Sequence, residues 1–127
     1  MLDLKCTGSK DIFPLAYAIH VLVNKAPVTM RSKDKPGVRI EKGKLIDDNY
    51  EGYVLKQVLE VGEVLKVTPI CGPYSGVPVV VVPVMEENEI TGAVGIVDLT
   101  AGIFEEIHSI TRRKELAKFL PDDAFPK

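Results

Sequence analysis

The stretch GVPVVVVPVMEENEITGAVGIVDLT, residues 76–100, decides the fold of this 127-residue chain. Its first arm, residues 77–85, is a nearly unbroken apolar run rich in valine. Such a run is typical of a strand that is covered on both faces, because β-branched side chains disfavour helix and suit a pleated sheet. Residues 86–89 are polar and predict a turn. The second arm, residues 90–99, carries two glycines where another backbone or a ligand can approach closely. The stretch predicts a hairpin of two buried strands.

Upstream of this hairpin the pattern predicts a helix over residues 10–24, with Ser9 or Asp11 as its cap. Apolar residues recur there at i, i+3, i+4 and i+7, so the helix has one buried face, and His20 lies beside that face. Strands are expected at residues 28–32 and 38–41, joined by the turn-forming residues 33–37.

A tight turn at residues 42–44 leads to Asp47-Asp48-Asn49, which has the chemistry of a helix cap. A second helix is therefore expected over residues 50–61, ending at Gly62. A strand over residues 64–70 and a loop over residues 71–76 then lead into the opening hairpin.

After the hairpin the sequence predicts a last helix from Thr100 to Leu120, ended by Pro121. The element order is α-β-β-α-β-β-β-α. The expected fold is an α+β single domain over residues 1–127, in which an antiparallel sheet of about five strands carries helices mainly on one face.

Composition narrows the class of protein. The net charge is −2 and the pI is about 5.7, so the chain lacks the basic excess of proteins that bind nucleic acid or anionic membranes. No apolar run approaches the ~20 residues of a spanning helix, and MLDLKCTGSK lacks the features of a signal peptide. We expect a cytoplasmic protein with no nucleic-acid or membrane partner, in which Cys6 and Cys71 are thiols and form no disulfide.

Two parts of the hairpin, GVPVVVVPV (76–84) and GAVGIVDLT (92–100), resemble the closing hairpin of Cache domains, which are relatives of PAS sensor domains. The element order fits the same type. Cache domains usually lie outside the membrane between spanning helices, and this sequence predicts no such helix. The whole chain, including APVTMRSKDKPGVRIEKGKLID and GIVDLTAGIFEEI, also resembles a methanogen-associated archaeal family that is catalogued as a domain of unknown function.

The resemblance to Cache and PAS domains implies a PAS/Cache-like (profilin-like) fold with a ligand between the concave sheet face and the segments that cover it. Basic side chains of the polar hairpin can clamp a carboxylate or phosphate there, or they form a solvated strand face. These are Arg31, Lys33 and Arg39. Tyrosines can line the pocket or pack in the core and at its rim. These are Tyr50, Tyr53 and Tyr74.

Asp98 ends the second arm of the hairpin. The resemblance implies that this carboxylate lies near the ligand and can receive an amine. The alternative is that Asp98 caps the last helix or ties down a turn, as Asp often does at such a junction. Both possibilities stay open at the level of sequence.

Enzyme signatures are sparse. The sequence contains no GxxxxGK[ST], GxGxxG, GxSxG or HExxH motif, and His20, His108, Cys6 and Cys71 have no metal-site spacing. We therefore predict no catalytic residue, metal or cofactor.

The expected function is a non-enzymatic small-molecule sensor or regulatory module. A small metabolic enzyme or enzyme subunit using the same pocket and a scaffolding protein without a ligand are the alternatives. The resemblance further implies a homodimer formed through the helices Asp11–Asn24 and Ile103–Leu120.

Overall fold

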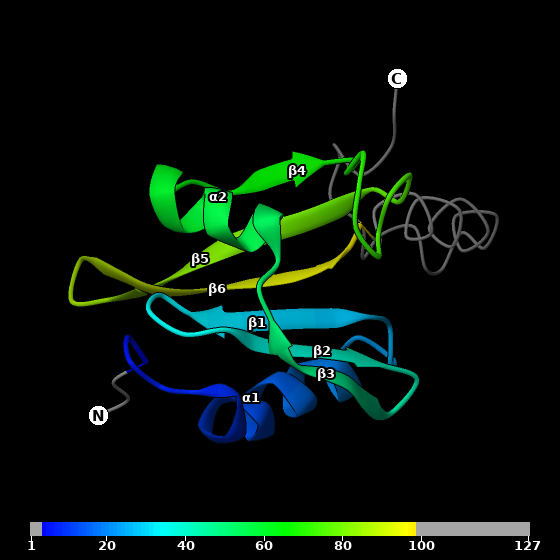
Figure 1. Cartoon of the computed structure of the whole chain (residues 1–127), viewed down its shortest axis with the longest axis horizontal. Coiled ribbons are helices and arrows are strands. Elements are labelled where there is room, and N and C mark those ends of the chain that lie inside the picture. Colours follow the sequence, from blue (N-terminus) through cyan, green and yellow to red (C-terminus); the bar gives the residue numbers. More distant parts are fainter. Residues whose placement is uncertain (1–3, 99–127) are drawn as a thin grey trace, which may run out of the picture. The chain divides into compact units, whose positions relative to one another are not determined.

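The computed structural model describes residues 4–98, in which one six-stranded antiparallel sheet carries two helices (Figure 1). The elements are α1 (Ser9–Leu22), β1 (Val28–Ser32), β2 (Gly37–Glu41), β3 (Lys44–Tyr50), α2 (Tyr53–Val61), β4 (Leu65–Val67), β5 (Val79–Glu86) and β6 (Glu89–Val97). The strand order is β3-β2-β1-β6-β5-β4. The mixed α+β class is confirmed, with one strand more than expected.

The hairpin of β5 and β6 lies inside the sheet, as the valine run predicts. The two strands pair from Val79↔Val97 to Glu86↔Glu89, and β6 also pairs with β1 along its other edge. Glu87 and Asn88 form the turn with φ of 52° and 66°, the left-handed geometry that matches the twist of a two-residue hairpin. This hairpin joins the two halves of the sheet.

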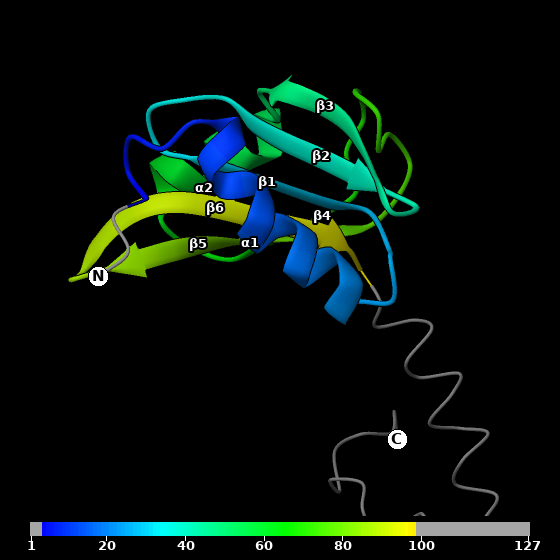
Figure 2. The same ribbon diagram turned by 90° about the horizontal axis from the view of Figure 1, so that it is seen from below.

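The two helices pack on opposite faces of the sheet, so the expectation of helices mainly on one face is wrong. Met30 and Val94 belong to the core around α1, whereas Ala93, next to Val94, belongs to the core around α2. Successive residues of a strand point to opposite faces. In Figure 2, α1 lies in front of the strands and α2 behind them. The valine run contributes side chains to the core around α1 and to the core around α2, so a helix is needed on each face to cover it.

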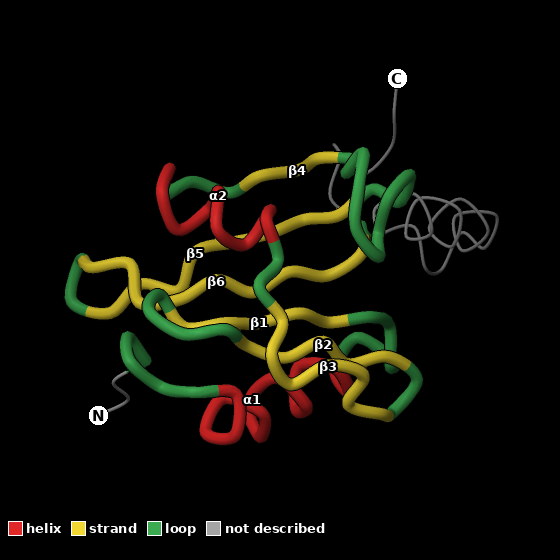
Figure 3. The backbone as a smooth tube through the Cα atoms, in the orientation of Figure 1, coloured by secondary structure: helices red, strands yellow, loops and turns green. Residues whose placement is uncertain are grey.

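Residues 44–50 form strand β3 instead of the expected helix cap, and α2 begins at Tyr53 (Figure 3). Pairing with β2 satisfies the backbone groups along one edge of this segment. Asp47 accepts a hydrogen bond from the backbone N–H of Asn49 at 2.9 Å, a local turn contact. The end of α2 is as expected, since Gly62 adopts the left-handed C-cap conformation.

Helix α1 differs from its prediction in its cap and in its buried face. Gly8 is the N-cap and no side chain caps the helix, so neither Ser9 nor Asp11 has that role. His20 is fully buried instead of lying beside the buried face. Its ring reaches the backbone of Ala26 and Gly43, and this brings the imidazole into the core.

Strand β4 covers only the start of the segment expected at residues 64–70, and a loop leads from it to β5. No disulfide joins Cys6 and Cys71, as expected. Within residues 4–98 no helix is long and apolar enough to cross a membrane.

Chain contacts divide the protein into Met1–Val97 and Asp98–Lys127. The predicted helix Thr100–Leu120 lies outside the described residues, and the single domain over residues 1–127 stays a prediction.

Candidate functional site

A cavity of about 220 Å³ lies on the sheet face that carries α2. Its floor includes Thr29 of β1, Gly95 of β6 and Val81 of β5, which are neighbours in one cross-strand row. The start of α2 forms a wall, and residues of the loop between β4 and β5 complete the lining. Most of the lining is apolar.

The middle of this row has no room for a side chain at position 95. Gly95 has no side chain, and a Cβ atom there would lie 2.9 Å from Val81 Cγ2 and 3.0 Å from Thr29 Oγ1. Both atoms therefore lie over the Gly95 backbone. A side chain at position 95 would displace Val81 or Thr29 on the floor of the cavity.

The Thr29 hydroxyl is a buried polar group on the floor of the cavity. The residue is 8% exposed and lines the cavity. Among residues 4–98, no hydrogen bond to Thr29 Oγ1 is formed, and no fully buried side-chain oxygen or nitrogen of the described chain lacks a partner. Thr29 Oγ1 thus retains its contact with the open space of the cavity.

The loop between β4 and β5 is held by its own backbone bonds. The N–H of Gly76 donates to the carbonyl of Pro69 at 2.9 Å, and the N–H of Val77 donates to that of Tyr74 at 3.0 Å. Gly72 and Gly76 have φ of 84° and 79°, which favours glycine at both turns. These bonds keep the loop closed on itself beside the cavity.

Tyr74 links this loop to strand β2. Its hydroxyl donates to Glu41 Oε2 at 3.3 Å and accepts from Arg39 Nε at 3.3 Å. Arg39 also holds Glu41 through its Nε at 2.7 Å and its Nη2 at 2.6 Å, and its guanidinium lies 5.5 Å from the centre of the Tyr74 ring. Arg39, Glu41 and Tyr74 form a charge-balanced group, which we call the rim cluster.

The protonation of the rim cluster follows from its contacts. Burial raises the pKa of Tyr74 to about 12, so its hydroxyl stays protonated at neutral pH. Burial alone would lower the pKa of Arg39, but hydrogen bonds to Tyr74 and Glu41 outweigh it and raise that pKa. Burial also raises the pKa of Tyr50, against the opposing effect of Arg39. At neutral pH the tyrosines are neutral, and Arg39 is paired with Glu41.

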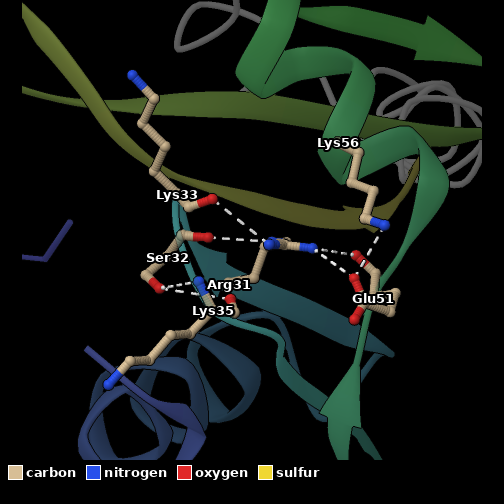
Figure 4. A network of polar contacts seen from close by, with 6 residues as sticks. All are labelled: Arg31, Ser32, Lys33, Lys35, Glu51 and Lys56. Carbon is tan, nitrogen blue, oxygen red and sulfur yellow. Dashed lines mark hydrogen bonds and ion pairs between the residues drawn. The ribbon is translucent and has the colours of Figure 1, made fainter. Parts of the chain in front are cut away.

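Arg31 is anchored outside the cavity by a separate network (Figure 4). The residue is 5% exposed and donates to the carbonyls of Ser32, Lys33 and Glu51 and to the Glu51 carboxylate. A hydrogen bond from Lys56 lowers the pKa of Glu51, and Arg31 adds to this effect. Arg31 ties β1 to the segment before α2.

The structure brings together some of the residues predicted from sequence. Tyr53 and Tyr74 line the cavity, and Arg39 contacts Tyr74 in the rim cluster. Arg31 uses its donors elsewhere, and Asp98 follows Val97, which lines the cavity. Their roles toward a ligand stay predictions.

Many of the lining residues were not predicted as site residues from the sequence, among them the polar residues Thr29 and Cys71 and the floor residue Gly95. Gly95 had a signal, since a glycine inside a strand indicates close approach. For Thr29 the only sequence signal was strand alternation, which places its side chain on the face of β1 opposite to those of Val28 and Met30. Within the described residues no cluster of His, Cys, Asp and Glu could hold a metal ion.

Comparison with known proteins gives relatives from archaea. Residues 19–100 match the family model described as "Uncharacterized protein conserved in archaea (DUF2111)". The chain is 61% identical over 119 residues to "Uncharacterized protein MJ0405" of Methanocaldococcus jannaschii, and the match covers 94% of this chain and 91% of the relative. No solved structure matches the chain.

Proposed function

The chain belongs to the archaeal family DUF2111, and we propose that it is a small-molecule-binding module, a sensor or regulatory protein, whose ligand occupies the cavity over Thr29 and Gly95. The observation that carries this proposal is the cavity itself. Ligand sites are concave, mostly apolar and equipped with a few polar groups, and this cavity has that composition. A scaffolding protein needs no such hollow in its core.

The polar groups of the lining favour binding over catalysis. Among the described lining residues they are the hydroxyls of Thr29 and three tyrosines and the thiol of Cys71. Acid-base catalysis uses a proton donor and acceptor whose pKa values lie near the working pH, and a high tyrosine pKa does not suit that role. The proposal is therefore a non-enzymatic module.

We also propose the finer assignment to a PAS/Cache-like form. It is supported by the resemblance of the β5–β6 hairpin and by a cavity between one sheet face and its covering segments. The expected homodimer stays part of this proposal: α1 leaves Leu15, Val21 and Leu22 exposed, while the second helix, Ile103–Leu120, lies outside the described residues. The cytoplasmic location rests on the sequence alone.

A thermal-shift screen of the full chain against cellular metabolites tests the binding function. A ligand that binds only the folded state, present at about 100 times its Kd, is expected to raise the Tm of a chain of this size by roughly 10 °C. The absence of any shift across a broad library would contradict the proposal.

A matched pair of variants locates the binding. Val81→Phe places a ring in the cavity and is expected to abolish the shift given by a hit compound. Val94→Phe adds the same ring to the core around α1, so it is expected to lower the Tm but to keep the ligand-induced shift. Equal shifts in both variants would mean that the compound binds outside the cavity.

A further inference from the structure

We propose that the ligand of this cavity is an uncharged, mainly apolar compound about the size of one substituted ring, with one hydrogen-bonding group directed at Thr29 Oγ1. This inference rests on the proposed binding function and narrows its ligand class. It follows from the charge balance around the cavity, the hydroxyl on its floor and its volume.

The two arginines predicted to bind a ligand are already paired with carboxylates of the protein. Arg39 is held by Glu41 at 2.6 and 2.7 Å, and Arg31 gives its hydrogen bonds to Glu51 and to backbone carbonyls. The described residues that line the cavity include no Lys, Arg, His, Asp or Glu. A charged ligand would lose its hydration without gaining an opposite charge, which is strongly unfavourable. An uncharged ligand has no such cost.

The floor of the cavity offers one buried hydroxyl. Thr29 is 8% exposed, it lines the cavity, and its Oγ1 lies over the backbone of Gly95. Within residues 4–98 it makes no hydrogen bond to the protein, whereas the Tyr74 hydroxyl is engaged by Arg39 and Glu41. A threonine hydroxyl both donates and accepts. A ligand hydroxyl, carbonyl or N–H group would supply the partner that the fold leaves out.

The volume sets the size of the ligand. An apolar cavity of about 150 Å³ holds benzene. The space over Thr29 measures about 220 Å³ and is walled by Tyr53, Val54 and Leu55 at the start of α2. It accommodates a single ring with a small substituent. The ring would lie against the valines, with its polar group toward Thr29.

Three probes of similar size test this class at neutral pH: p-cresol, which is neutral and carries a hydroxyl, toluene, which lacks it, and benzoate, which is an anion. Calorimetric titration measures their Kd with the full chain and with two variants. Thr29→Val removes the hydroxyl from the floor at nearly constant shape. Ser32→Ala removes a hydroxyl from the same strand on the opposite face, where Ser32 contacts Lys35.

We expect Thr29→Val to weaken p-cresol binding about tenfold, the usual worth of one hydrogen bond, and to change toluene binding less than about twofold. Ser32→Ala should change neither, and benzoate should bind at least about tenfold more weakly than p-cresol. Tighter binding of benzoate would overturn the uncharged class, and equal loss of p-cresol and toluene in Thr29→Val would overturn the role of the hydroxyl. Either result leaves the binding function standing. If none of the probes binds, this inference fails, whereas the proposed function fails only if the metabolite screen also gives no shift.

Discussion

Replacing His20 with alanine is expected to lower the free energy of unfolding by about 3–5 kcal/mol. The ring is fully buried, with Nδ1 2.7 Å from the carbonyl oxygen of Ala26 and Nε2 2.9 Å from the backbone nitrogen of Gly43. Because Gly43 N–H donates to Nε2, the proton of the neutral ring is on Nδ1 and is donated to Ala26. Alanine would leave a cavity and two unpaired backbone groups.

Urea denaturation followed by circular dichroism measures this loss, and Leu22→Ala is the control on the same helix. Leu22 is 83% exposed, so its truncation is expected to cost less than about 0.5 kcal/mol. A loss below about 1 kcal/mol in His20→Ala would show that the imidazole does not join α1 to the β2–β3 turn.

Gly37→Ala is expected to cost about 3 kcal/mol of stability, because no room exists for a side chain at this position. A Cβ atom on Gly37 would lie 1.8 Å from the carbonyl oxygen of Met30 and 2.6 Å from the Cα of Arg31. Both are backbone atoms of β1, so relief requires the strands to move apart. The pairing Met30↔Val38 would be disturbed directly.

The same urea titration applies to Gly37→Ala, with Gly8→Ala as the matched substitution. Among the described residues, a Cβ on Gly8 would meet only the Lys35 side chain, at 4.0 Å, so the expected cost is that of a poorer helix cap, about 1 kcal/mol or less. Equal losses in the two variants would contradict the tight approach of β1 and β2.

The sequence predicted the elements whose signals are local. The valine run, the polar turn at residues 86–89 and Gly62 at the end of α2 all appear where expected. Strand β3 was missed because it is a mostly exposed edge strand, and its polar residues carry no burial pattern. The valine run indicated that both faces of the sheet are covered. The prediction of helices mainly on one face was inconsistent with that indication.

Parts of the site could not be predicted because they depend on contacts between residues that are distant in the sequence. Thr29 lines the floor because β1 pairs with β6, which places it beside Gly95. His20 is buried because the turn at Gly43 returns to α1. Arg31 was expected either to clamp a ligand or to belong to a solvated strand face, and the structure pairs it with the segment at Glu51. Tyr53 and Tyr74 were predictable as lining, since an apolar ring with a polar tip suits a pocket.

The most direct test of the binding function is an amide NMR titration of the isotope-labelled full chain with a deproteinised small-molecule extract of methanogen cells. A ligand in the cavity is expected to shift the amides of Thr29 and Gly95 on the floor and of Gly72 in the loop, all of which line the cavity. The amides of Ile12 and Ala16, in the core around α1, should stay unchanged. An unchanged spectrum, or shifts confined to the α1 side, would contradict a ligand in this cavity.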